Sequence, residues 1–334
     1  MKKNKILAFM MAIAFCTALL MQPGIVMAKE TDTFVIEEGN DYSGFKCVGI
    51  SELKESDSVL YTLEHVNTGA QLVWVKNSDT NKGFAITFKT PADNDKGIPH
   101  IIEHSVLGGS EKYPLKSPFF RLESQSLKTF LNAFTTSAYT YYPLASRNDK
   151  DFNNLVSVYL DAIFSPKFLE NEKIFMEQGI RKEIFKQEDP IVYNGVVYNE
   201  MKGYEPDPYR NLNRLVNRTL YPDTPYRFYS AGDPEEIQQL TYEEFKEFYL
   251  SYYQPSNALF YFYGDLYLPE YLEYINDEYL VSYEKQEKVE IQRQPESGRK
   301  LENTAYYPMR RVTGDGSFLT HKKVMAEKWG CCTE

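Results

Sequence analysis

The sequence predicts a chain of mixed α and β structure, and three patterns support this prediction. Residues 71–76 and 83–89 carry alternating apolar side chains, the pattern of half-buried strands. Residues 149–164 carry apolar side chains at helical spacing, which predicts an amphipathic helix with one buried stripe. That stripe consists of Phe152, Leu155, Tyr159 and Ile163. Thr241 and Glu244 form the spacing of a capping box, which predicts a helix through about residue 252.

The N-terminus, residues 1–28, has the pattern of an export signal. Three lysines lie within the first five residues, residues 6–21 are apolar, and Val26-Met27-Ala28 supplies small residues at a cleavage site. The alternative is a membrane anchor that stays attached, but the apolar run is short for a spanning helix. We therefore expect cleavage after Ala28, a secreted or extracytoplasmic protein, and no stable membrane insertion after cleavage.

The net charge of the chain argues against two classes of binding partner. The formal net charge is −10, and it becomes −13 once the three lysines of the signal are removed. An acidic chain is a poor partner for nucleic acid and for anionic membrane surfaces. After cleavage, Cys47, Cys331 and Cys332 remain, which are too few for a disulfide framework.

The most informative stretch is residues 97–105, which contain two histidines four positions apart with a glutamate between them. His100, Glu103 and His104 can share one face of a helix, since positions i, i+3 and i+4 are neighbours there. Two neutral imidazoles with this spacing often bind zinc, and the carboxylate can then act as a general base. The order His-x-x-Glu-His is the inverted form of a common zinc-protease motif. The alternative is an amphipathic helix that carries two histidines by chance, although the chain has only four.

The remaining elements follow in order along the chain. Residues 29–59 are polar and mixed, which predicts an extended lead-in segment. Residues 90–96 are rich in turn formers, and Pro99 falls in the first turn of the motif helix. Apart from the helices already described, the patterns predict helices at 118–130 and 171–187 and strands at 138–145 and 257–264.

A zinc ion held by two histidines needs a third protein ligand. Glu200 lies in the run Val-Tyr-Asn-Glu-Met-Lys-Gly and is one candidate among many acids. Spacing alone does not single it out, because glutamates are common on helix surfaces.

At this point the residues resemble a known family. The run from Gly97 to Pro114, GIPHIIEHSVLGGSEKYP, is similar to the zinc site of the pitrilysin/insulysin superfamily of inverted-motif zinc metallopeptidases. The similarity continues, in order, through residues 126–166, 197–203 and 240–266, and it is strongest to the presequence-protease branch. The resemblance implies an α+β fold, with a mostly antiparallel sheet and helices packed on one side.

The resemblance also implies roles for individual residues. It makes His100, His104 and Glu200 ligands of Zn²⁺, and Glu103 the general base of a zinc metalloendopeptidase. In the superfamily a peptide adds as a strand to a sheet edge, and the matching segment here is Asn132-Ala133-Phe134. The expected substrates are therefore unstructured peptides.

The expected domains differ from those of the family, because peptidases of this branch are much longer chains. We expect a zinc-binding peptidase domain at 60–266, the start of a second, incomplete domain at 267–308 and an atypical tail at 309–334. The tail has five basic and three acidic residues in an acidic protein, which fits either a frameshifted or truncated reading frame or a divergent end. The chain is then a secreted peptidase, active alone or with a separately encoded C-terminal half, or a catalytically incompetent fragment that binds zinc and peptide.

Overall fold

A computed structural model describes residues 34–295, 301–310 and 317–326, the last two ranges for their backbone only. The expected export signal and residues 327–334 of the expected tail lie outside the described residues. Within them, no helix combines the length and apolar character needed to cross a bilayer.

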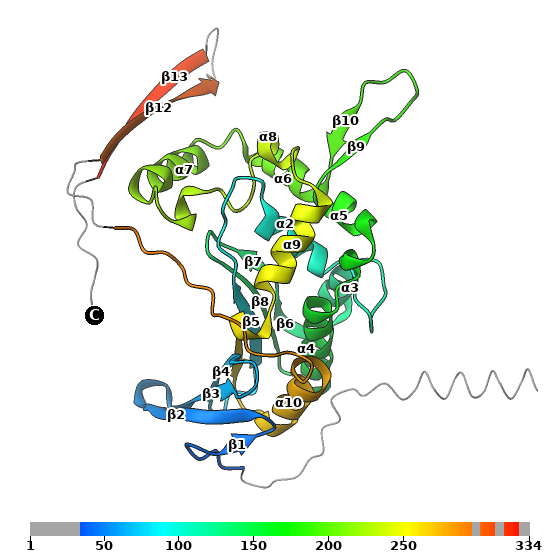
Figure 1. Ribbon diagram of the computed structural model, residues 1–334, viewed down its shortest axis with the longest axis vertical. Coiled ribbons are helices and arrows are strands. Elements are labelled where there is room, and N and C mark those ends of the chain that lie inside the picture. The colour runs from blue at the N-terminus through cyan, green and yellow to red at the C-terminus, as the bar shows by residue number, and fades with distance from the viewer. Residues whose placement is uncertain (1–33, 296–300, 311–316, 327–334) are drawn as a thin grey trace, which may run out of the picture.

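The centre of the molecule is a nine-stranded sheet with the order β1-β2-β3-β4-β11-β5-β8-β6, and β7 also pairs with β8 (Figure 1). Every pairing is antiparallel except that of β11 with β4. The strands are β1 (Asp41–Tyr42), β2 (Phe45–Leu53), β3 (Ser58–His65), β4 (Gln71–Lys76), β5 (Lys82–Lys89), β6 (Lys128–Leu131), β7 (Phe134–Thr135), β8 (Tyr139–Ser146) and β11 (Ala258–Tyr263).

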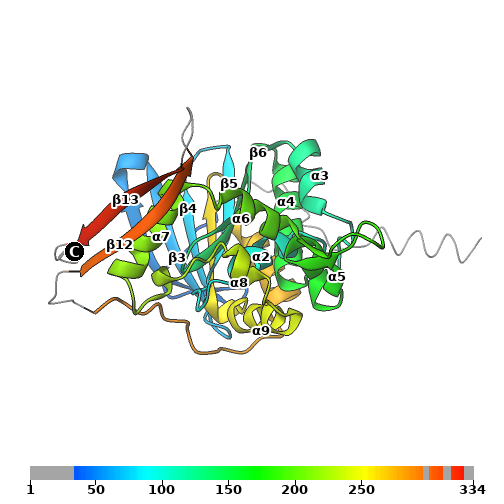
Figure 2. The same cartoon turned by 90° about the horizontal axis from the view of Figure 1, so that it is seen from above.

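Helices cover one face of this sheet (Figure 2). Along β5 the side chains of Phe84, Ile86 and Phe88 are buried, while the intervening residues are only partly covered. The helices are α2 (Ile98–Val106), α3 (Pro118–Gln125), α4 (Asp149–Phe164), α5 (Glu172–Gln178), α6 (Val196–Tyr204), α7 (Pro208–Leu220), α8 (Pro234–Ile237), α9 (Tyr242–Tyr252) and α10 (Leu268–Ile275). The mostly antiparallel α+β fold is confirmed.

Short elements complete the described chain. Two hairpins lie apart from the main sheet, β9 (Arg181–Glu183) with β10 (Val192–Asn194) and β12 (Leu301–Arg310) with β13 (Ser317–Ala326). The 3₁₀ turns are Lys54–Ser56, Lys167–Leu169, Pro225–Arg227 and Pro255–Asn257, and residues Asn276–Leu280 form a π-helical turn after α10.

Two expected helices are shorter than predicted. The helix expected at 118–130 ends at Gln125, and residues 128–131 form β6 instead, because they pair with β8. The helix expected at 171–187 ends at Gln178, and the chain turns at Gly179 into the β9–β10 hairpin. In both cases long-range pairing overrides the local pattern.

The hydrophobic core extends beyond the limits expected for the peptidase domain. The segment expected as a lead-in supplies β1 and β2, and Phe45 and Cys47 of β2 are fully buried against the sheet. On the other side, Leu268, Tyr271 and Leu272 of α10 are buried in the same core. Residues 41–53 and 268–280 therefore help to build the domain that the motif helix belongs to.

Candidate metal centre

Helix α2 presents the two motif histidines. Gly97 precedes it with a φ of 70°, Pro99 lies in its first turn, and eight of its nine residues are buried. Its apolar side chains join the core, which fixes the direction in which the polar side chains point. The rings of His100 and His104 lie 4.8 Å apart at 86° to one another, so both nitrogen edges can face one point.

Helix α6 brings a carboxylate to the same point. Glu200 Oε2 lies 3.8 Å from His100 Nε2 and 3.8 Å from His104 Nε2. Among the described residues these three side chains form the one group of three or more His, Cys, Asp or Glu whose ligand atoms are close enough to hold a metal ion. His65, by contrast, is buried elsewhere, where its ring nitrogens bond Thr68 and Asn276.

A close backbone contact sets the position of α6. Gly195 precedes the helix, and a Cβ at this position would clash with the carbonyl oxygen of Gly179 at the end of α5. Gly179 in turn packs tightly against the side chain of Ile101 in α2. The absence of a side chain at both glycines therefore lets α6 approach α2 closely enough to deliver Glu200.

The donor set fits a zinc ion. His100 Nδ1 donates to the carbonyl oxygen of Ala231 at 3.0 Å, which leaves Nε2 with a free lone pair. Burial, with a contribution from His100, lowers the pKa of His104 to about 4, although the hydrogen bond between His104 and Gln178 acts to raise it, so this imidazole is neutral at pH 7. Ligand atoms around tetrahedral zinc lie roughly 3.3 Å apart for bonds of about 2.0 Å, close to the 3.8 Å separations here.

Glu103 lies beside this group rather than in it. Its carboxylate is buried and accepts a hydrogen bond of 2.6 Å from the hydroxyl of Thr135 in β7. Burial raises the pKa of Glu103, and Glu200 adds to this, while Thr135 and His100 oppose it. The sequence did not point to Thr135, because only the pairing of β7 with β8 brings it to α2.

The predicted substrate segment lies at the end of the sheet. Asn132 and Ala133 join β6 to β7, and Phe134 begins β7, where its ring stacks on Tyr141 at 5.1 Å. Tyr159 of α4 donates a hydrogen bond of 3.3 Å to the Asn132 carbonyl oxygen. The segment is therefore adjacent in sequence to Thr135 and is held by a hydrogen bond from the buried helix α4. Its contact with a peptide stays a prediction.

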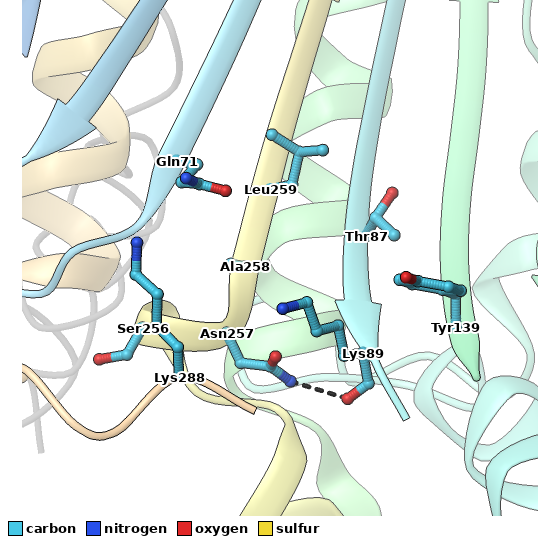
Figure 3. A pocket seen from close by; sticks show the side chains of 9 residues that line it. All are labelled: Gln71, Thr87, Lys89, Tyr139, Ser256, Asn257, Ala258, Leu259 and Lys288. Carbon is cyan, nitrogen blue, oxygen red and sulfur yellow. Dashed lines mark hydrogen bonds between the residues drawn. The ribbon is translucent and has the colours of Figure 1, made fainter. Parts of the chain in front are cut away.

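A small pocket is separate from the candidate centre. Figure 3 shows its lining, in which Asn257 donates to the Lys89 carbonyl oxygen. The residues are Gln71, Thr87, Lys89, Tyr139, Ser256, Asn257, Ala258, Leu259 and Lys288. Thr87 and Lys89 alternate with the helix-facing residues of β5, so the pocket lies on the other face of the sheet. It contains none of the three ligand candidates.

Comparisons with protein families give two matches along the chain. Residues 90–201 match the family model "Insulinase (Peptidase family M16)", and residues 239–310 match "Peptidase M16 inactive domain". The first match contains the whole ligand group and Glu103. The second begins just before α9.

Curated relatives and solved structures agree with these matches. The chain is 45% identical to Protein HypA of Clostridium perfringens over 84% of this chain and 30% of that protein. It is 48% identical to Presequence protease 1, chloroplastic/mitochondrial, of Arabidopsis thaliana, over 66% of this chain and 21% of that protein. It thus spans between a fifth and a third of these relatives.

Among solved structures, pitrilysin has a similar fold, with a TM-score of 0.56 and 17% identity over 77% of this chain and 26% of that one. A protease from Helicobacter pylori gives a TM-score of 0.52 and 20% identity over 70% of this chain and 52% of that one. These likenesses concern the fold. Together with the family matches and the relatives, they show that the chain belongs to the pitrilysin/insulysin superfamily of peptidases, and to its presequence-protease-like part.

Proposed function

We propose that the chain is a secreted zinc metalloendopeptidase, or the part of one that carries the metal ligands, and that it hydrolyses unstructured peptides. The observation that carries the proposal is the convergence of His100, His104 and Glu200 beside a buried Glu103. Bound zinc would supply a Lewis acid that makes water nucleophilic at neutral pH and polarises the peptide carbonyl.

The residues of the chain would act around that ion in distinct ways. His100, His104 and Glu200 hold it, and the hydrogen bond to Ala231 keeps the His100 ring in the required tautomer. Glu103 takes a proton from the water that attacks the carbonyl carbon, and delivers it to the amine as the C–N bond breaks. Thr135 holds one oxygen of that carboxylate in place through its hydroxyl.

The class of substrate follows from the edge of the sheet. A peptide that pairs with the segment Asn132-Ala133-Phe134 would bind through its backbone, which gives affinity with little sequence preference. Only an extended, unstructured peptide can offer its backbone in this way. The alternative function is binding of zinc and peptide without turnover, or a role as one half of an enzyme whose C-terminal half is separately encoded. The chain spans no more than about a third of the two relatives described above, so the activity of those whole proteins is part of the proposal.

Cleavage of a quenched fluorescent, unstructured peptide by the purified chain tests this proposal. We expect cleavage that a chelator abolishes and that Glu103→Gln abolishes while one zinc per chain is retained. Glu111→Gln, which alters an exposed carboxylate close to α2, is the matched control and should retain activity. An active Glu103→Gln variant would contradict the assigned role. One bound zinc without cleavage would support the binding alternative. N-terminal sequencing of exported protein, expected to begin at Lys29, tests secretion.

A further inference from the structure

The orientation of His100 depends on a loop that lies far away in the sequence. Its Nδ1 atom donates to the backbone carbonyl of Ala231, between the 3₁₀ turn at Pro225–Arg227 and α8. Because a carbonyl can only accept, this bond fixes both the proton on Nδ1 and the direction of Nε2. A shift of Ala231 would therefore turn the metal-binding edge of His100.

Both sides of Ala231 are anchored to one residue, Asp95. The backbone N–H of Tyr229 donates to Asp95 Oδ1 at 2.6 Å, and that of Asp233 donates to the Asp95 carbonyl oxygen at 2.8 Å. Next to these bonds Gly97 and Gly232 are in backbone contact, and a Cβ on Gly97 would lie 2.7 Å from Gly232 Cα. Both glycines have positive φ, of 70° and 102°. The loop is thus held tightly against the residues that lead into α2.

Arginines of α7 hold Asp95 and the loop from outside. Arg218 pairs with Asp95 Oδ2 at 2.6 Å, and Arg214 pairs with Asp233 Oδ2 at 2.5 Å. The guanidinium of Arg214 also lies over the ring of Tyr229, at 4.5 Å from its centre. These arginines are four residues apart, so they share one face of the helix. No residue of α7 is fully buried, so these polar contacts are a substantial part of what attaches it to the loop.

We propose that Asp95 is a positioning residue for the metal ligand His100, and that Arg218 on α7 holds Asp95 in place. The inference rests on the proposed function, because it concerns a ligand of the proposed zinc ion. Asp95 acts through the loop, and its carboxylate is not a member of the ligand group. The structure thereby links α7, more than a hundred residues away in sequence, to the geometry of the metal centre.

Zinc affinity of the purified chain, measured by competition with a chromophoric chelator, tests the inference. Removal of groups that orient a ligand typically weakens metal binding by about 10–100-fold, and we expect a loss in this range for Asp95→Ala. Asp95→Asn keeps an acceptor for Tyr229 but loses the charge, so its loss should be smaller and equal to that of Arg218→Gln. The absorption spectrum of the Co²⁺-substituted chain should change in Asp95→Ala, because it reports ligand geometry.

Asp149→Asn is the matched control. It removes the ion pair between Asp149 and Lys82. This pair has the same N–O distance of 2.6 Å as the pair between Arg218 and Asp95, but it joins α4 to β5 outside the metal centre. We expect unchanged zinc affinity and an unchanged Co²⁺ spectrum. The inference is wrong if Asp95→Ala and Asp95→Asn bind zinc as the wild type does. It is also wrong if Asp149→Asn loses as much zinc affinity as the Asp95 variants do. Failure of the wild type to bind zinc, or binding that survives His104→Ala, would instead contradict the proposed function.

Discussion

The two helices that supply the candidate ligands are held in contrasting ways. Eight of the nine residues of α2 are buried, including Ile101 and Ile102 in the main core, so burial of apolar surface fixes this helix. Only three of the nine residues of α6 are buried, and Glu200 itself is 36% exposed. Besides these three buried side chains, α6 is positioned by one close contact of backbone, between Gly195 and Gly179.

The comparison separates the rigid part of the centre from the adjustable part. The histidines and Glu103 share a helix whose movement would disrupt the core, and interiors are packed too densely to tolerate that. Glu200 and the Ala231 carbonyl come from segments attached by glycine contacts and ion pairs. We therefore expect substitutions around α2 to lower stability most, and substitutions around α6 to lower metal affinity more selectively.

The largest effect on stability is expected from Ile102→Ala. Ile102 is fully buried, and truncation leaves a cavity that typically costs about 2–5 kcal/mol. Val196→Ala in α6, where the side chain is 44% exposed, should cost less than about 0.5 kcal/mol. Urea unfolding of the metal-free chain measures both free energies. Similar losses would show that α2 is not fixed by burial.

An intermediate effect is expected from Gly195→Ala. The added methyl group meets the Gly179 carbonyl oxygen, so α6 must shift, at a cost of about 1–3 kcal/mol. Because the shift moves Glu200, zinc affinity should fall by about tenfold or more, which corresponds to about 1.4 kcal/mol.

Gly203→Ala in the same helix is the control for this prediction. A Cβ there has no neighbour within 4 Å, and alanine favours helix by roughly 0.5–1 kcal/mol. Its zinc affinity should match the wild type. Chelator competition on both variants decides the matter: equal affinities would mean that the glycine contact does not place Glu200.

The smallest effect on stability is expected from Glu244→Gln. Lys96, just before α2, lies 2.6 Å from Glu244 in the first turn of α9, and this hydrogen bond, with those from Thr241, lowers the pKa of Glu244. A lowered pKa means that the carboxylate stabilises the fold above its ordinary pKa, and that this contribution is lost as the pH falls through the folded value. Since the Glu244 side chain is 40% exposed, the free energy of unfolding at pH 7 should be lower in Glu244→Gln than in the wild type by about 0.2–1 kcal/mol.

This difference should decrease between pH 5 and pH 3. Unfolding by urea across that range measures it, with Glu243→Gln as the control for an exposed carboxylate in the same turn. A difference that grows on acidification would contradict the sign of the shift.

Local patterns predicted several elements correctly. The stripe of α4 is fully buried in all four of its residues, and the capping box of α9 has both of its hydrogen bonds. The cap of α4 is Asn148, whose side chain accepts a hydrogen bond from the backbone N–H of Asp151. Elements that depend on partners distant in sequence were predicted poorly. Most of β6 was expected to be helix, and the position of β11 between β4 and β5 was not expected.

The sequence by itself determined the spacing of His100, Glu103 and His104, because helical geometry places side chains three and four positions apart on one face. It left Glu200 as one acid among many until a resemblance singled it out. Only the tertiary structure brought Glu200, Thr135 and the Ala231 carbonyl to that face, through contacts between segments 32 to 131 residues apart from their partners. Such contacts arise from sheet pairing and glycine packing, which a local pattern does not encode.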